Sequence, residues 1–257
     1  KISRHSKRLA LFLTFCAGYV DAYTFIVRGN TLVAGQTGNV VFLSVGIVQR
    51  NLADAEIKIL TLLSFMLGVF LLTIYKEKLR IVKKPILSLV PLAILSLIIG
   101  FVPLSVDNMF IIPPLAFCMG LVTTAFGEVS GIAYNNAFMT GNIKRTMLAF
   151  GEYVRTKHTA FLMEGLIFVS LLVSFILGVV FSAYLTIIFN EKTILGVPIM
   201  MSIFYLSMLF ASWRKKYLSK IWNHAILVEL TMHDPVQPHE HRCSSYNKFK
   251  LRHYRLA

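Results

Sequence analysis

Two matched polar interruptions in a very apolar chain restrict what this sequence can fold into. Thr37-Gly38-Asn39 and Thr140-Gly141-Asn142 repeat one tripeptide, and each follows a long hydrophobic segment and opens a short apolar run. The likeness continues downstream, where Ser64–Val69 is answered by Ser174–Val179. The chain is therefore interpreted as a duplication. A repeat with a polar, Gly-containing break in each copy is typical of membrane transporters whose site lies between the halves.

Composition favours a bilayer over water as the surroundings of this chain. Of its 257 residues, 56% are hydrophobic and 15% are charged, against about a quarter charged in an ordinary soluble domain. The mean hydropathy is +0.68. The charged residues gather in short clusters, which leaves apolar stretches of roughly the 17 to 25 residues that a membrane-spanning helix needs. The net charge of +14 is interpreted as membrane topology, because cytoplasmic loops collect Lys and Arg, and no nucleic-acid partner is expected.

The apolar stretches predict an all-α membrane protein with six transmembrane helices, at residues 9–27, 57–75, 85–104, 110–127, 160–188 and 194–213. The shorter segments 33–48 and 137–150 contain the polar breaks and are predicted to be re-entrant or broken helices. If both are re-entrant, the basic clusters fall on one side, as the positive-inside rule requires; if both span, the cluster at 76–84 lies outside. Three full spans in each copy then make an inverted-topology repeat.

Four regions follow from this pattern. Residues 1–8 are predicted to be a basic cytoplasmic N-terminus, 9–104 the first membrane repeat and 105–213 the second. Residues 214–257 are predicted to be a basic, His-rich cytoplasmic tail of low order, because they show no sustained apolar period. Both termini are therefore expected in the cytoplasm.

Asp21 is the first candidate for function, because ionisable groups inside a membrane are costly and rare. It lies in the second half of the first span and is expected to bind a cation or to carry a proton. The alternative is that Asp21 caps a neighbouring helix or pairs with Arg28. Gly18 shares a helix face with Asp21, and glycines at matched positions 68 and 178 are assigned to close helix packing.

The two tripeptides have a more specific interpretation. Thr or Asn at a helix start accepts hydrogen bonds from free backbone N–H groups, and Gly permits a backbone turn inside the membrane. The short helices would then point their N-terminal ends inward, which suits an anionic or carbonyl-bearing ligand. The alternative is that each motif only caps a kinked helix. The predicted substrate-binding residues are Asp21, Gln36, Thr37, Gly38, Asn39, Asn136, Thr140, Gly141 and Asn142.

Glu128 is a second coupling candidate beside Asp21. It stands near Asn136 in the connection to the second broken segment, where the two copies differ most in polarity. A site for an asymmetric ligand predicts such a difference, and drift of a loop explains it equally well.

Enzyme chemistry is not expected of this chain. It has no Walker loop, no Gly-x-Ser-x-Gly and no His-Glu-x-x-His motif. Cys16, Cys118 and Cys243 are too few and scattered for a disulfide framework or a metal cluster. No cofactor and no metal site are predicted. The expected partners are the lipid bilayer and an unidentified small molecule or ion, and self-association is left open.

Ala17-Gly18-Tyr19-Val20-Asp21-Ala22, followed by Gly35-Gln36-Thr37-Gly38-Asn39-Val40, resembles the YoaK-like bacterial membrane proteins, grouped as domain of unknown function 1275. A second Thr-Gly-Asn about a hundred residues later belongs to the same pattern. The likeness covers roughly residues 7–213. It implies a polytopic protein of about six spans in a bacterial inner membrane, and it implies no substrate.

The resulting hypothesis is a secondary transporter of a small solute whose central site is formed by the two Thr-Gly-Asn motifs. A channel or pore, with the paired breaks as its filter, is the first alternative. A membrane partner or regulator that transports nothing is the second.

Overall fold

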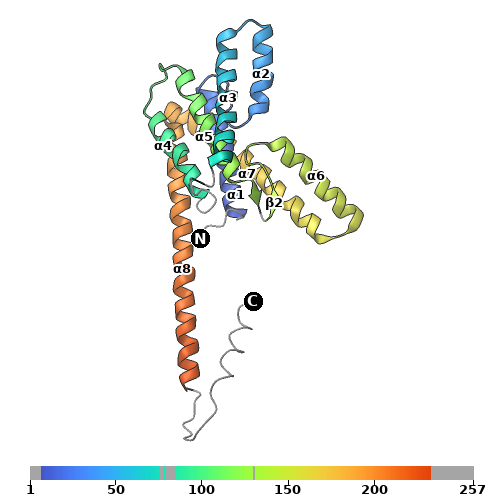
Figure 1. Ribbon diagram of the computed structural model, residues 1–257, viewed down its shortest axis with the longest axis vertical. Helices are drawn as coiled ribbons and strands as arrows, with labels where there is room; N and C mark the ends of the chain where they lie inside the picture. Colours follow the sequence, from blue (N-terminus) through green and yellow to red (C-terminus); the bar gives the residue numbers. More distant parts are fainter. Residues whose placement is uncertain (1–6, 76–77, 79–84, 130, 233–257) are drawn as a thin grey trace. The chain divides into compact units, whose positions relative to one another are not determined.

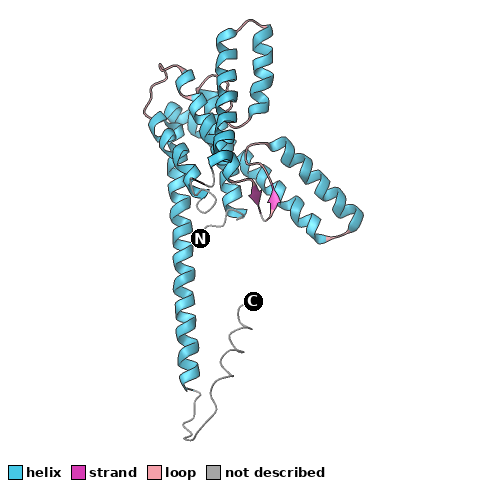
Figure 2. Cartoon of the chain, in the orientation of Figure 1, coloured by secondary structure: helices cyan, strands magenta, loops and turns pink. Residues whose placement is uncertain are grey.

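The computed structural model describes residues 7–75, 78, 85–129 and 131–232, and most of these are helical (Figures 1 and 2). The first half contains α1 (Lys7–Val27), α2 (Gln36–Val48), α3 (Leu52–Tyr75), η1 (Pro85–Leu89) and α4 (Val90–Ile99). The second half contains η2 (Asn108–Phe110), α5 (Ile112–Ala125), β1 (Glu128–Val129), β2 (Ile132–Ala133), α6 (Met139–Thr156), α7 (Thr159–Phe189), η3 (Asn190–Leu195) and α8 (Gly196–Met232). The strands β1 and β2 form a short antiparallel hairpin.

The chain divides into two compact units, Lys1–Met208 and Leu209–Ala257. The first unit contains every element up to the first part of α8. In the second unit, α8 continues to Met232 and carries the ring of Trp213 between those of Phe210 and Tyr217. The sequence predicted low order from residue 214 onward, whereas α8 continues to Met232. Residues with good helix propensity extend the hydrogen bonding of the preceding apolar turns. Residues 233–257 lie outside the described part.

The core of the first unit is built on α1 and α5, the first long helix of each proposed repeat. Both have side chains buried all round, including Leu13 and Tyr19 on α1 and Leu115 and Met119 on α5. Helices α3 and α7 are mostly exposed by comparison. A helix that is apolar and buried on every side needs neighbours around its whole circumference, so α1 and α5 occupy the interior.

The long helices pack crosswise between the two halves of the chain. Helix α1 lies along α7, and α5 lies along α3. The described elements of the first unit sort by extensive contact into two groups. The α1–α7 group contains α1, β1, β2, α6, α7 and η3, and the α3–α5 group contains α2, α3, η1, α4, η2 and α5; the first part of α8 is assigned to neither group. Close backbone contact between the groups runs through α4 and η3, where Gly100 lies against Leu195, and side chains of both groups pack in one hydrophobic core.

Four glycines make the crosswise packing possible. A Cβ on Gly18 would overlap the carbonyl oxygen of Phe175, and a Cβ on Gly178 would overlap that of Phe15. The α3–α5 contact has the same reciprocal form: a Cβ at position 68 would overlap the Phe117 carbonyl oxygen, and one at position 120 would overlap that of Phe65. In each case the contacted carbonyl lies three residues before the glycine on the partner helix. The packing role predicted for Gly68 and Gly178 is confirmed, and Gly18 and Gly120 are their partners in these contacts.

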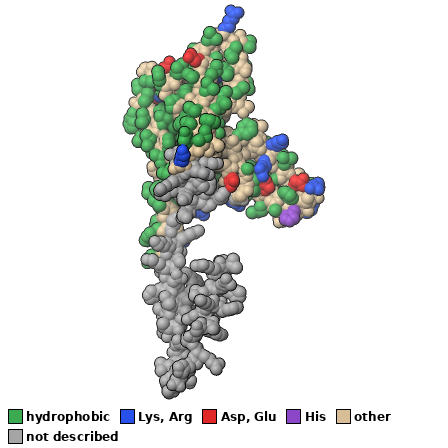
Figure 3. All heavy atoms as spheres, viewed as in Figure 1, with side chains coloured by type: hydrophobic (Ala, Val, Ile, Leu, Met, Phe, Trp, Pro, Cys, Tyr) green, Lys and Arg blue, Asp and Glu red, His purple; other side chains and the backbone are tan. Residues whose placement is uncertain are grey.

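The outer surface of the helices is apolar, as expected for contact with lipid. Helices α2 and α3 form one antiparallel pair, and α6 and α7 form another (Figure 1). On the face in Figure 3, hydrophobic side chains cover the α2–α3 region, and charged side chains gather over α6 and the start of α7. The exposed hydrophobic side chains of α2 include Val41, Val45 and Val48. Contiguous apolar surface of this extent marks a membrane-embedded protein.

Among the described residues, four helical stretches are long and apolar enough to cross a membrane: Lys7–Val27, Leu52–Tyr75, Asn108–Ala125 and Thr159–Ala211. The last contains two of the predicted spans, separated by η3. Gln36–Val48 and Ile86–Ile99 are shorter apolar helices, so the third predicted span, 85–104, is shorter in the structure. The count of six spans stays a prediction. Most of the basic cluster at 76–84, on which the topology argument depends, lies outside the described residues.

Replacing Gly68 or Gly178 by Ala is expected to destabilise the protein by about 1–3 kcal/mol, because the added Cβ meets a backbone carbonyl that must move. Gly151→Ala in α6 is the matched control, since its Cβ would meet nothing and the helix gains about 0.5–1 kcal/mol. Thermal unfolding of the detergent-purified protein measures both. Equal melting temperatures for the three variants would contradict the packing described.

Candidate functional site

Asp21 holds the chain that leads into α2. Its Oδ1 accepts hydrogen bonds from the N–H groups of Val33 and Ala34 at 2.9 and 2.7 Å, and its Oδ2 accepts one from Gly35 at 3.0 Å. The side chain is only 4% exposed. A carboxylate beside free N–H groups at a helix start is favourable, because it satisfies donors there and compensates the helix dipole.

This geometry is the one that the helix-capping interpretation of Asp21 describes. The buried carboxylate makes no ion pair with Arg28 in the described part of the chain. Cation binding or proton coupling through Asp21 stays a prediction, and the three backbone donors leave it little accepting capacity to spare.

The two Asn residues of the repeated tripeptide do the same structural work in each half. Asn39 donates from Nδ2 to the Leu32 carbonyl at 2.5 Å and accepts from the Leu32 N–H at 2.9 Å. Asn142 donates from Nδ2 to the Asn135 carbonyl at 2.7 Å. Each side chain thus fastens the residue seven positions earlier, and both are buried, at 1% and 3% exposed. The motif closes the loop before a short helix.

The remaining residues of the two motifs lie around the Asn39 and Asn142 side chains. Gln36 accepts from Asn39 through Oε1 at 3.1 Å and donates to the Val33 carbonyl at 2.9 Å. The glycines at positions 38 and 141 lie within the first helical turn without positive φ, so they do not make the backbone turn that was expected of them. They leave room for Leu32 and Phe138 instead. Thr37 and Thr140 are exposed, and neither caps its helix.

A hydrogen bond in the second half of the chain corresponds to those that Asp21 makes with the loop before α2. We call each of these side-chain hydrogen bonds to the loop before a short helix a tie. Thr123 occupies the position on α5 that Asp21 occupies on α1, and its hydroxyl donates to Asn136 Oδ1 at 3.0 Å. Asn136 is fully buried, and its Nδ2 has no hydrogen-bond partner. The predicted site residue Asn136 therefore has a buried N–H donor without an acceptor in the described chain, and its role in binding stays a prediction.

Glu128, the second coupling candidate, is an exposed residue of β1 that pairs across the hairpin with Ala133. Next to this hairpin, Tyr134 packs with Ala10, Val129 and Phe168 in a small apolar cluster. Burial raises the pKa of Tyr134, so its hydroxyl stays protonated at physiological pH.

Direct helix packing does not bring the two tripeptides together. Among the described elements, α2 makes extensive contact with α3, and α6 with α7, but α2 makes none with α6. A single central site that contains Asn39 and Asn142 stays a prediction. Within the described residues, no group of three His, Cys, Asp or Glu is placed to hold a metal ion.

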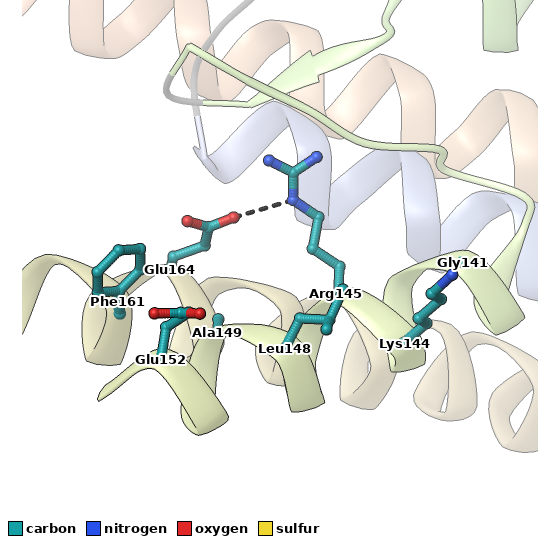
Figure 4. Close-up of a pocket in the computed structure, with 8 residues that line it drawn as sticks. All are labelled: Gly141, Lys144, Arg145, Leu148, Ala149, Glu152, Phe161 and Glu164. Atoms are coloured by element: carbon teal, nitrogen blue, oxygen red, sulfur yellow. Dashed lines mark hydrogen bonds and ion pairs between the residues drawn. The ribbon is translucent and has the colours of Figure 1, made fainter. Parts of the chain in front are cut away.

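A cavity of about 320 Å³ lies between α6 and the start of α7 (Figure 4). Arg145 and Glu164 point toward one another across it, with Nε and Oε1 2.9 Å apart. The Arg145 guanidinium also lies 5.3 Å from the centre of the Phe168 ring and donates to the Ala133 carbonyl at 3.2 Å. This cavity is open to the surface. The contacts of Arg145 with Glu164 and with the Ala133 carbonyl anchor α6 to α7 and to the hairpin. Its lining residues are Gly141, Lys144, Arg145, Leu148, Ala149, Glu152, Phe161 and Glu164.

Arg28 is a buried charged residue that the sequence suggested only as a possible partner of Asp21. It is 1% exposed; Nε donates to the Tyr23 hydroxyl at 3.2 Å and Nη2 to the Val102 carbonyl at 3.0 Å. Nη1 has no partner. Arg28 follows Asp21 by seven residues, so on a helix both lie on the same face. This spacing is the sequence signal that could have identified Arg28 as buried.

Apolar helices with an apolar exterior and buried polar ties define a helical membrane protein. A family model described as "Protein of unknown function (DUF1275)" matches residues 9–208. The chain belongs to this family, as the resemblance of its motifs implied. No curated protein and no solved structure matches the chain.

Replacing Asp21 by Asn is expected to loosen the loop before α2. The amide keeps one acceptor but turns an N–H₂ group toward a backbone donor, at a cost of about 1.5–3 kcal/mol for the charged hydrogen bonds lost. Hydrogen exchange of the segment around Ala34 should speed up. Asp107→Asn is the control, because this exposed residue caps η2 and Asn caps equally well. Unchanged exchange in the Asp21 variant would refute the capping role.

Proposed function

We propose that this protein is a secondary transporter of a small solute, not an enzyme, built as an inverted pair of repeats in a bacterial inner membrane. The observation that carries the proposal is the crosswise packing. Helix α1 of the first repeat is paired with α7 of the second, and α5 of the second repeat with α3 of the first. Each rigid group therefore contains helices of both repeats.

A two-fold axis relating the repeats accounts for this exchange. Under such an axis, the contact of α1 with α7 must reappear as the contact of α5 with α3, and the matched glycine-to-carbonyl contacts are what it predicts. Combined with an odd number of spans in each repeat, the axis lies in the membrane plane. Six spans and cytoplasmic termini complete this proposed topology.

Alternating access follows from the way the two groups are joined. Close backbone packing within each group resists deformation, whereas close backbone contact between the groups runs through α4 and η3, and the rest of their contact is side-chain packing in one shared hydrophobic core. We propose that the α1–α7 group rocks against the α3–α5 group. Short polar ties also cross this boundary, because the Asp21 tie runs from α1 to the loop of α2, and the Thr123 tie from α5 to the loop of α6.

The inverted topology is tested by labelling cysteines at the ends of the two short helices. Gln49→Cys and Thr156→Cys place a thiol at exposed positions at the C-terminal ends of α2 and α6, in a chain whose natural cysteines are replaced by Ala. A membrane-impermeant maleimide is expected to label the first variant in intact cells, and the second only after permeabilisation. Labelling of both from the same side would rule out the inverted repeat.

Transport is tested by flux into proteoliposomes, with solutes chosen by a thermal-shift screen of the purified protein, since a true ligand stabilises the state it binds. Saturable uptake is expected. A flux that stays linear with concentration would favour a pore, and no flux for any stabilising solute would favour the regulator alternative.

Locking the two groups together should stop transport. The double variant Gly100→Cys/Leu195→Cys places thiols at the contact between α4 and η3, where a Cβ on Gly100 would meet the Leu195 side chain. Oxidation to the disulfide is expected to abolish uptake, and reduction to restore it. Each single cysteine variant is the control and should be insensitive to oxidant. Full uptake by the oxidised double variant would contradict rocking at this boundary.

A further inference from the structure

Arg28 lies at the boundary between the two rocking groups. It follows the last turn of α1, in the α1–α7 group, and its Nη2 donates to the carbonyl of Val102, just after α4 in the α3–α5 group. Its Nε donates to Tyr23, one turn earlier on α1. The side chain is 1% exposed, so the guanidinium is enclosed where the two groups meet.

The positive charge of Arg28 is not neutralised by a direct contact, although the charge of the Glu191 carboxylate on η3 acts on the adjoining Tyr23 hydroxyl. Its two hydrogen-bond acceptors are a hydroxyl and a carbonyl, both neutral. No carboxylate of the described chain is within ion-pair distance, and the carboxylate of Asp21 is occupied by three backbone N–H groups. Buried charges in proteins are paired or ligated, because an isolated ion loses its hydration on burial.

The donors at this place are also incompletely used. Nη1 of Arg28 has no hydrogen-bond partner. The hydroxyl of Tyr23 is fully buried and accepts from Nε, which leaves its own O–H to donate. Close by, Nδ2 of Asn108 approaches the backbone at Gly29. A buried guanidinium N–H without an acceptor, beside a hydroxyl that can also donate, is the complement of an anion.

We propose that Arg28 binds a small anion through Nη1, and that the solute moved by this protein is therefore a small anion such as a halide or a short carboxylate. The inference rests on the proposed transport function for the second statement only. The near-complete enclosure of the guanidinium limits the ligand to a small one in this state. Separation of the two groups breaks the bond from Nη2 to Val102 and opens the site to solvent.

The test compares anions at constant ionic strength. The melting temperature of the full-length protein in detergent is measured in sodium gluconate, which is too large for the site, and then with gluconate replaced stepwise by chloride, formate, acetate or phosphate. At least one small anion is expected to raise the melting temperature saturably, by roughly 5 °C at about a hundred times its Kd.

Arg28→Gln removes the charge, and the shift with that anion should disappear. Without its unbalanced charge, this variant is expected to melt in gluconate no lower than the wild-type protein. Arg50→Gln, on the exposed turn after α2, is the matched control and should keep the full shift. A purely structural Arg28 predicts the opposite pattern, with a lower melting temperature for Arg28→Gln in every salt.

Identical wild-type melting temperatures in all five salts would overturn the proposal, and this measurement stands even if Arg28→Gln does not fold. An anion shift that persists in Arg28→Gln would overturn it as well. A shift that Arg28→Gln abolishes, without uptake of that anion into proteoliposomes, would support the binding site and contradict the transport function. Uptake of a cation or neutral solute, with no shift of the melting temperature by any anion, would support the transport function and contradict the anion site.

Discussion

Direct contact between helix backbones at four glycines is the constraint on which the rest of this structure depends. Because Gly18 and Gly178 have no side chain, α1 and α7 approach until the carbonyls of Phe15 and Phe175 fill the missing Cβ positions. The same arrangement joins α3 to α5. In a bilayer no hydrophobic effect drives one apolar helix onto another, so close van der Waals contact of this kind supplies much of the association energy.

The polar breaks of the chain are stabilised inside this apolar frame by local hydrogen bonds. Backbone freed from helical pairing at membrane depth must find partners within the protein. Asp21 satisfies three N–H groups before α2, and Asn39 and Asn142 fasten the loops before both short helices. The repeated tripeptide thus has an architectural role in each half, beside any contact with a solute.

The crosswise packing of helices from the two proposed repeats is the structural basis of the proposed mechanism. Each rigid group takes its long helices from both halves of the chain, so the boundary between the groups crosses the connections within each repeat. Buried polar groups with unused donors stand near this boundary, including Arg28 on one side and Asn136 in the connection from α5 to α6. A site at the boundary is exposed or enclosed by the same motion that separates the groups.

The helices themselves were predictable because hydrophobicity and length are local properties. Predicted spans 9–27 and 160–188 agree closely with α1 and α7. The matched glycines were equally informative about close packing, since a missing side chain at a repeated position has few other uses in a membrane helix. The span predicted at 85–104 was too long, because Pro91 and Gly100 bound a shorter α4; a hydropathy pattern does not register such interruptions.

Sequence alone therefore determined that this is a helical membrane protein of this family, it predicted a duplicated chain, and it singled out Asp21 and the two Thr-Gly-Asn motifs. Only the tertiary structure decided that α1 pairs with α7 rather than with a helix of its own repeat, that Asp21 caps the chain before α2, and that Arg28 is enclosed with an unused donor. The physical reason is that these depend on contacts between residues distant in the chain, such as Arg28 with Val102, and no local pattern encodes which distant partner a side chain meets.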